Sequence, residues 1–165
     1  MEIRRIDGGV PTDAIAVRRA VFIDEQGVPE ARELDGKDRE STHFVAYDDG
    51  EPIGTARFRE YEYVGEAERT GGTDGEGTSD SGGTSDSGGT VKIERVAVVA
   101  DRRGEGIGRE LMLAIERAVA AAGYDRIVLH AQVPVIDFYE SLGYDTVGDR
   151  FEEAEIPHQR MTKVL

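Results

Sequence analysis

The hydrophobic and polar positions of the first 29 residues predict one short strand and one long helix. Residues 2–6 have the length and apolar spacing of a strand. Three apolar positions then recur at helical spacing: Ala14, Val17 and Val21. We expect Thr12 or Asp13 to cap this helix, since both are good N-cap residues. The helix should run to about Glu25, because the sequence Gln26-Gly27-Val28-Pro29 follows and its glycine and proline oppose continuation.

The rest of the chain reads as strands that alternate with two further helices. Six runs have the length and composition of strands: 43–47, 53–60, 91–99, 126–131, 144–150 and 155–164. Asp48-Asp49-Gly50 predicts a hairpin turn between the first two of them. A long helix is expected to end at Gly123, with one apolar stripe: Ile107, Leu111, Ile115, Ala118 and Ala122. A short helix over 135–142 should end at Gly143.

This order of elements predicts an α/β fold in which helices cover a mixed β-sheet. The length of 165 residues suits a single domain, 1–165. One segment departs from the pattern: residues 71–90 contain only Gly, Ser, Thr, Asp and Glu. Such a stretch cannot bury enough apolar surface to offset the entropy of ordering it. We therefore predict a flexible inserted loop over 64–90, which acts either as a lid or as an inert insertion.

Composition narrows the class of protein. The net charge of −14, from 34 acidic and 20 basic residues, argues against nucleic-acid binding, which needs clustered cations. The absence of cysteine excludes disulfides and a cysteine nucleophile. No apolar run reaches the length of a membrane span, and the first residues lack a signal-peptide core, so we expect a cytoplasmic protein. With 17 Arg and only 3 Lys, the acidic surface would suit a halophilic source.

The glycine-rich stretch 102–108, Arg-Arg-Gly-Glu-Gly-Ile-Gly, carries the strongest chemical signal. It connects a predicted strand to the start of a predicted helix, whose free N–H groups and dipole favour a phosphate. Its G-x-G-x-G spacing is neither the dinucleotide fingerprint nor a P-loop, because no Gly-Lys-Ser/Thr follows. A packing turn with no ligand remains the structural alternative.

These residues resemble a known superfamily. Arg103-x-x-Gly106-x-Gly108 is similar to the R/Q-x-x-G-x-G/A signature of the GNAT N-acetyltransferases, and residues 138–144, FYESLGY, resemble that family's F-Y-x-x-x-G-F/Y segment. Segments 21–27, 130–132 and 156–158 further resemble the small ElaA-like branch. The resemblance implies a mixed central β-sheet flanked by helices, whose parallel strands 91–99 and 126–131 splay apart to hold acyl-CoA. It also implies a bulge in the first strand, which a switch in apolar phase between Ile93 and Val96 weakly supports.

The resemblance further implies which residues bind acetyl-CoA. Backbone groups of strand 91–99 should contact the pantetheine arm, and the N–H groups of 103–109 should bind the pyrophosphate. The expected cofactor-binding residues are Val96, Ala97, Val98, Arg103, Gly104, Glu105, Gly106, Ile107, Gly108, Arg109, Gln132 and Phe138. Gln132 departs from the family, since many relatives have Asn there, and this leaves its contact with the pantetheine arm in doubt. No metal is expected, because the three histidines lack ligand spacing.

Two residues are the predicted catalysts. Tyr139 matches the family's general-acid tyrosine, which protonates the departing thiolate; an anchoring core tyrosine is the alternative. Glu94 is the candidate base, acting directly or through a water, unless it only pairs with Arg95 or Lys92 or faces solvent. The backbone N–H of Val96 would polarise the carbonyl.

The sequence gives fewer indications of the residues that bind the amine acceptor. The residues that could border it are Glu25, Gln26, Arg57 and His130, with His43 and His158 as packing residues. His130 is a second base candidate, and Arg57 could receive an acceptor carboxylate or form a surface ion pair.

The leading hypothesis is therefore an acetyl-CoA-dependent N-acetyltransferase that moves an acetyl group to a small-molecule or peptide amine in a ternary complex. A non-catalytic acyl-CoA-binding or sensing protein of the same fold is the alternative, and a different phosphate-ligand protein is a third. No nucleic-acid or membrane partner is expected. A homodimer through edge strands stays open by analogy.

Overall fold

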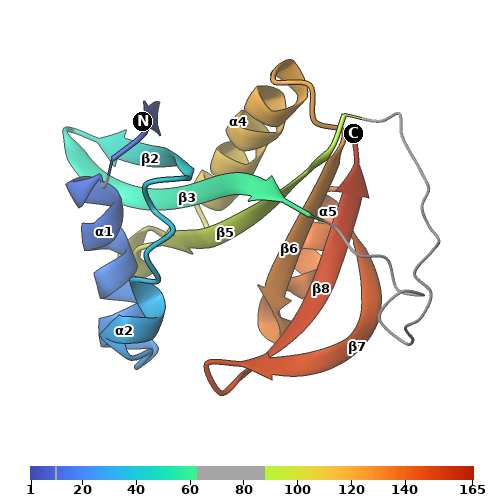
Figure 1. Cartoon of the computed structure of the whole chain (residues 1–165). Coiled ribbons are helices and arrows are strands. Elements are labelled where there is room, and N and C mark those ends of the chain that lie inside the picture. Colours follow the sequence, from blue (N-terminus) through green and yellow to red (C-terminus); the bar gives the residue numbers. More distant parts are fainter. Residues whose placement is uncertain (10, 63–87) are drawn as a thin grey trace. The chain divides into compact units, whose positions relative to one another are not determined.

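The computed structural model describes residues 1–9, 11–62 and 88–165 (Figure 1). Two compact units divide the chain: residues 1–59 with 93–118 form the first, and residues 60–92 with 119–165 form the second. Each unit is described by itself. The predicted loop 64–90 falls mostly outside the described residues. No helix in the described ranges combines the length and apolar character that crossing a bilayer requires.

The first unit contains strands in the order β1-β2-β3-β5. Their bounds are Glu2–Asp7 for β1, Thr42–Asp48 for β2, Glu51–Tyr61 for β3 and Thr90–Val98 for β5. β1 and β3 both pair antiparallel with β2. Asp49 and Gly50 connect β2 to β3 with φ angles of 52° and 79°, which is a type I′ turn and confirms the predicted hairpin. These strands were all predicted to within three residues at each end.

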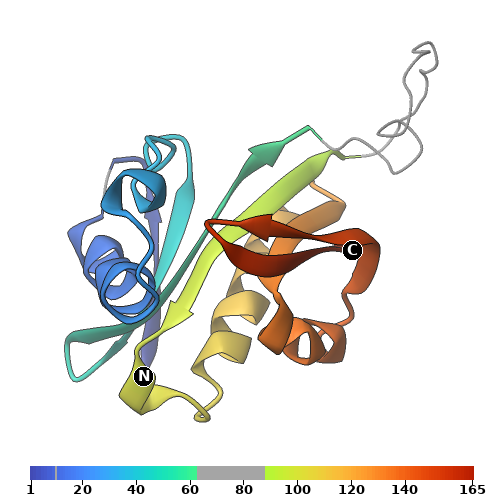
Figure 2. The same cartoon turned by 90° about the horizontal axis from the view of Figure 1, so that it is seen from below.

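Helices cover both faces of this part of the sheet (Figure 2). They are α1 (Thr12–Arg18), which continues as a π-helical segment η1 (Arg19–Glu25), then α2 (Glu30–Glu33), the 3-10 turn η3 (Ala100–Arg102) and α4 (Ile107–Ala121). The predicted face of α1 is buried: Ala14 packs with Val45 and Tyr47, and Val17 and Val21 pack with Ala97. On the opposite face α4 lies so close to β3 that a Cβ at Gly54 would meet Ile107 and Leu111 at 3.1 Å.

The structure corrects three details of the predicted helices. Pro11 is the N-cap of α1 and makes no side-chain cap, whereas Asp13 accepts a hydrogen bond of 2.6 Å from the Tyr47 hydroxyl. The short helix α2 was not predicted. In α4, Ala122 is exposed because the helix ends one residue earlier, and Ala118 is only half-buried. Met112 and Val119 complete the buried stripe instead.

The second unit contains the beginning of β5 followed in the sheet by β6, β8 and β7. Their bounds are Arg126–Gln132 for β6, Asp145–Glu153 for β7 and Ile156–Val164 for β8. β8 pairs antiparallel with both β6 and β7. A 3-10 turn, η4 (Val133–Val135), leads from β6 into α5 (Ile136–Ser141), which confirms the predicted short helix. The chain from β5 to β6 passes through α4, the kind of crossover that a parallel pair requires.

Candidate active site

The glycine-rich loop forms the start of α4, as predicted. Gly104 and Gly106 have φ angles of 81° and 85°, which residues with a Cβ rarely adopt. A Cβ at either position would meet no atom within 4 Å, so the backbone here lies open. The N–H of Glu110 bonds to the carbonyl of Gly106 at 3.1 Å, which leaves the preceding N–H groups at the helix start without helical partners. This geometry suits a phosphate group.

Arg103 is held across this loop by a carboxylate from a distant part of the sequence. Its two terminal nitrogens bond to Glu25 at 2.7 and 2.8 Å, and its Nε donates to the carbonyl of Val98 at 2.9 Å. Hydrogen bonding to Arg103 lowers the pKa of the Glu25 carboxyl. Glu25 was predicted to border the acceptor side, which stays a prediction; the structure pairs it with Arg103 at the glycine loop. The π-helical turn of η1 positions Glu25 at its last residue.

The other predicted residues of the loop are exposed or half-buried, except for Ile107. Ile107 is buried in the core, and Gly108 follows it in the first turn of α4. The side chain of Glu105 pairs with Arg102 at 3.0 Å, while Arg109 is exposed. Gln26 is exposed at the end of η1.

Strand β5 has an irregularity at the place where the sequence predicts a bulge. Arg95 has a φ of 60° within the strand, a left-handed conformation that a non-glycine residue adopts rarely. A residue in this conformation inside a strand is typical of a bulge. Ala97 is buried, whereas Val96 and Val98 are half-buried, so burial does not follow the predicted phase switch. The splay between β5 and β6 stays a prediction.

Glu94 lies just before this irregularity and is bound by two arginines of β3. Arg57 Nη2 and Arg59 Nε donate to Oε1 of Glu94 at 2.9 and 2.8 Å, and Arg59 Nη2 reaches Oε2 at 3.2 Å. The Glu94 side chain is only 9% exposed. Its partners thus include Arg57 and Arg59, which the sequence did not indicate. The two guanidinium groups form charge-assisted hydrogen bonds with this one carboxylate, mostly with Oε1.

Arg57 is the centre of a buried network that we call the ionic cluster. The cluster comprises four guanidinium groups and four carboxyl groups, which balance in charge: Arg18, Glu33, Asp35, Asp38, Arg57, Arg59, Glu94 and Arg95. Arg57 is fully buried and donates to Asp35, Asp38 and Glu94 through all three of its nitrogens. The prediction of a surface ion pair for Arg57 is therefore wrong, and the guanidinium has no donor left for an acceptor carboxylate.

Opposing effects set the pKa values within the ionic cluster. Burial alone would raise the pKa of Asp38, but hydrogen bonds from Arg18 and Arg57 outweigh it and the net pKa is lowered. The same balance lowers the pKa of Asp35. Burial prevails for Glu33, whose pKa is raised although Arg95 and Arg18 oppose the shift. Beside the cluster, His43 donates from Nε2 to the Asp38 carbonyl at 3.0 Å, and burial lowers its pKa.

The second unit places His130 against a carboxylate and an aromatic ring. His130 Nδ1 lies 3.0 Å from Glu153 Oε1, and the imidazole meets the Phe151 ring edge-on at 4.9 Å. The hydrogen bond with His130 lowers the pKa of Glu153 to about 2. Because the ionised carboxylate can only accept, Nδ1 carries a hydrogen, and in the neutral form of the imidazole the lone pair lies on Nε2. His158 stacks on the other side of Phe151, which fits its predicted packing role.

Tyr139 of α5 is buried, and its ring packs edge-on against Phe138 at 4.9 Å and Tyr144 at 5.9 Å. Burial raises the pKa of its hydroxyl, so this group stays protonated at neutral pH. Within the described ranges, no hydrogen bond to the Tyr139 hydroxyl is found. Phe138 and Gln132 are both half-buried, Gln132 at the end of β6.

Sequence reasoning missed three acidic residues: Glu33 at the end of α2, and Asp35 and Asp38 in the loop that follows it. A polar segment with this composition is normally expected to be exposed to solvent. Their spacing, E-x-D-x-x-D, followed by His43 on the next strand, is a pattern that could have marked a structured loop.

Comparisons with known proteins agree with the fold and with the resemblance. A model described as the acetyltransferase (GNAT) family matches residues 14–144. The uncharacterised N-acetyltransferase YjcF of Bacillus subtilis (strain 168) is 34% identical over 152 residues, which are 92% of this chain and 90% of that protein. The crystal structure of Escherichia coli ElaA has a TM-score of 0.74 at 24% identity and covers 99% of both chains.

A more distant structure has the same fold and a bound donor. It is a GNAT family acetyltransferase from Elizabethkingia anophelis with acetyl-CoA bound, with a TM-score of 0.64 at 14% identity over 99% of this chain and 97% of that chain. These similarities give no support to a halophilic source. The family model spans most of the chain, and YjcF exceeds 30% identity across nearly its whole length. The chain therefore belongs to the GNAT family of N-acetyltransferases and has the α/β fold of that family.

Proposed function

We propose that the protein transfers the acetyl group of acetyl-CoA to a primary amine by direct attack in a ternary complex. The observation that carries this proposal is the loop 103–108, where two glycines with positive φ open the backbone at the start of α4. The free N–H groups there fit the pyrophosphate of CoA. Acetyl-CoA supplies the activated acyl group. The residues of the chain bind this cofactor and donate or accept the protons that the transfer requires.

Tyr139 is the proposed general acid. A departing CoA thiolate must receive a proton, and the Tyr139 hydroxyl carries one at neutral pH. The hydroxyl accepts or donates no hydrogen bond within the part of the chain that the structure describes, so its proton is not committed to a neighbouring side chain. This supports the role that the resemblance gives to Tyr139.

The amine must also lose a proton before it attacks. Glu94 is the base that the resemblance suggests, acting through a water, but its carboxylate is bound by Arg57 and Arg59. His130 is the second candidate, and its contacts favour it. Glu153 fixes the imidazole through Nδ1, which leaves the lone pair of Nε2 to take a proton. We propose His130 as the proton acceptor and Glu94 as a positioning residue.

Calorimetry with acetyl-CoA, CoA and ATP tests the donor site. We expect acetyl-CoA and CoA to bind, ATP to bind far more weakly, and the double variant Arg103→Glu, Gly106→Pro to lose binding. Gly123→Ala, at another glycine with positive φ, is a control for backbone strain away from the loop. A folded protein that does not bind CoA would contradict the proposal. If ATP bound as tightly as CoA, the loop would instead be a site for a phosphate ligand other than CoA.

Release of the CoA thiol with a panel of amines tests catalysis. The panel should contain polyamines, amino sugars, free amino acids and short peptides. His130→Gln should lower kcat roughly 100-fold or more, within the range for a lost general base. Glu94→Gln should lower kcat less. CoA binding without thiol release for any amine would favour the non-catalytic acyl-CoA sensor.

A further inference from the structure

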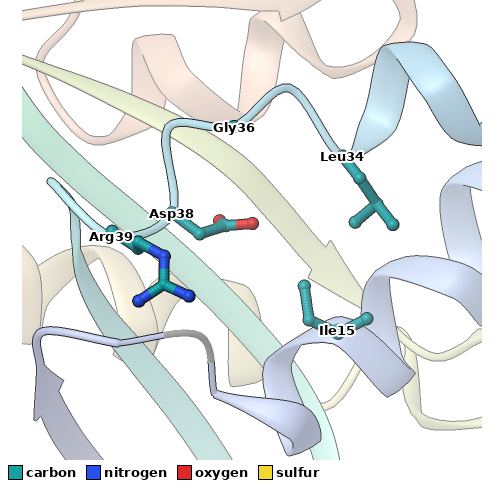
Figure 3. Close-up of a pocket in the computed structure, with 5 residues that line it drawn as sticks. All are labelled: Ile15, Leu34, Gly36, Asp38 and Arg39. Carbon is teal, nitrogen blue, oxygen red and sulfur yellow. The ribbon is translucent and has the colours of Figure 1, made fainter.

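A pocket of about 290 Å³ lies in the first unit, between α1 and the loop that joins α2 to β2 (Figure 3). Five residues line it: Ile15, Leu34, Gly36, Asp38 and Arg39. Its volume is close to the lower end of the range for small-molecule sites, about 300–1,000 Å³. The lining combines two aliphatic side chains, one stretch of glycine backbone and two side chains of opposite charge. None of the residues assigned to acetyl transfer above belongs to it.

Asp38 presents one carboxylate oxygen to this pocket. Its side chain is 8% exposed, and Oδ1 accepts hydrogen bonds from Arg18 at 2.6 Å and Arg57 at 2.8 Å. No hydrogen bond to Oδ2 is found in residues 1–9, 11–62 and 88–165. Figure 3 shows the carboxylate directed into the space beside Ile15 and Leu34. Oδ2 is not among the fully buried atoms that lack a partner, so it is accessible from the pocket and can accept a hydrogen bond from a ligand donor there.

The arginines behind Asp38 prepare it to receive that donor. Because they bind Oδ1, they fix the plane of the carboxylate and direct Oδ2 outward. They also outweigh the effect of burial, and the net pKa of Asp38 is lowered. The carboxylate is thus ionised and acts only as an acceptor. An ammonium group is the donor that forms the strongest hydrogen bond with it.

Arg39 supplies a positive charge at the same pocket. Its side chain is exposed and, in the described part of the chain, forms no ion pair or hydrogen bond. A guanidinium in this position suits a ligand carboxylate. Ile15 and Leu34 supply the apolar wall, which lies on the side of Asp38 away from Arg39 in the view of Figure 3. A ligand that matches all three features is a small zwitterion with an aliphatic side chain.

We propose that this pocket binds an α-amino acid with an aliphatic side chain, with its ammonium on Asp38 and its carboxylate on Arg39. The binding does not depend on acetyl-CoA or on the transfer reaction, so the proposal stands or falls separately from the proposed function. L-Leucine is the probe, because it carries both charged groups and a branched apolar side chain.

Calorimetry of the full chain in low salt, without acetyl-CoA, tests the ligand chemistry. L-Leucine should bind more tightly than each of three partial analogues. 4-Methylpentanoate lacks the ammonium and should lose at least about tenfold in affinity, as expected for a missing charge-assisted hydrogen bond. Isopentylamine lacks the carboxylate and should lose about two- to fivefold, because Arg39 is exposed. Glycine lacks the side chain and should bind more weakly than leucine. Equal affinities for the four compounds, or no leucine binding at 10 mM, would overturn the proposal.

Variants locate the binding. Asp38→Asn disturbs the ionic cluster and can fail to fold, so the decisive variants are at the rim and wall of the pocket. Arg39→Gln should weaken leucine binding about two- to fivefold, and Ile15→Trp should abolish it by filling the space. Lys37→Gln is the matched control, since it removes the same charge from an exposed residue of the same loop outside the lining. Circular dichroism confirms folding. Leucine affinity that is unchanged in Arg39→Gln and Ile15→Trp would place the site elsewhere and refute the proposal.

Discussion

The ionic cluster of the first unit and the His130 site of the second unit handle buried charge in opposite ways. In the cluster, Arg57 donates through all three of its nitrogens, and Glu94 is bound by two guanidinium groups. In the second unit, His130 has a carboxylate on one nitrogen only, and the Tyr139 hydroxyl has no hydrogen bond in the described ranges.

The difference indicates which groups can do chemistry. A group whose donors and acceptors are all engaged is held in place and must break a hydrogen bond before it can move a proton. A group that has one polar atom fixed by a hydrogen bond and another without a partner is oriented and still able to react. The cluster is suited to positioning strands and loops, whereas His130 and Tyr139 are suited to the proton transfers that we propose for them. The following variants test this distinction.

The largest effect is expected from Arg57→Met. The substitution leaves Asp35, Asp38 and Glu94 with fewer partners in a buried site. Removing one partner of a buried ion pair costs about 3–5 kcal/mol, so the free energy of unfolding measured in urea should fall by that amount. Arg117→Met, at an exposed arginine of α4, should change it by less than about 0.5 kcal/mol. If both variants were equally stable, the ionic cluster would not contribute to the stability of the fold.

Tyr139→Phe should lower kcat roughly 100-fold or more and leave the Kd of CoA unchanged. The hydroxyl is the only group removed, and general acids contribute in this range. The rate is measured as CoA thiol release with the best amine of the panel. Tyr144→Phe is the matched control, because Tyr144 is an equally buried neighbour whose ring packs on Tyr139. A similar loss in both variants would show that Tyr139 only anchors α5.

A smaller effect, of opposite sign, is expected from Glu25→Gln. Glu25 competes with any bound phosphate for Arg103, because it holds both terminal nitrogens of that side chain. Both residues are about two-fifths exposed, so the ion pair is weak. Its loss should raise the affinity for acetyl-CoA about two- to fivefold in calorimetry. Glu30→Gln, which breaks the similarly exposed pair with Arg19, should not. Weaker acetyl-CoA binding in Glu25→Gln would mean that Glu25 orients Arg103 toward the donor.

Local patterns in the sequence were sufficient to predict most elements of both units. The face of α1 and the turn at Asp49-Gly50 depend on residues that are close together in the chain, and each was predicted. The open glycine loop was predicted for the same reason. Where the prediction failed, a local rule met a competing contact: Asp13 bonds to Tyr47, 34 positions away, instead of capping its helix.

Local sequence patterns could not predict the ionic cluster. Arg57 meets Asp35 and Glu94 from 22 and 37 positions away, and no local pattern distinguishes a buried aspartate from a solvated one. The π-helical turn of η1 was also invisible, because helical periodicity does not reveal a single wider turn. That turn brings Glu25 to Arg103, 78 positions later, at the glycine loop.

The smallest expected effect tests the His130 site through its carboxylate. The pKa of Glu153 is about 2 in the folded protein, against an ordinary value of 4.5. A carboxyl with a depressed folded pKa stabilises the fold above its unfolded pKa, and this stability is lost as the pH falls from about 4.5 to 2. Because the Glu153 side chain is 41% exposed, solvent screening limits the contribution to about 0.5–1 kcal/mol.

Glu153→Gln should therefore be less stable than the parent at pH 7 by about that amount and should lose less stability between pH 4.5 and 2. Urea unfolding at a series of pH values measures both quantities. Glu152→Gln, at the exposed neighbour on β7, should keep the parent's pH dependence. If Glu153→Gln kept it as well, the hydrogen bond to His130 would not hold the imidazole firmly. Nδ1 would then be as free as Nε2, and the second unit would lose the fixed end that its proposed chemistry requires.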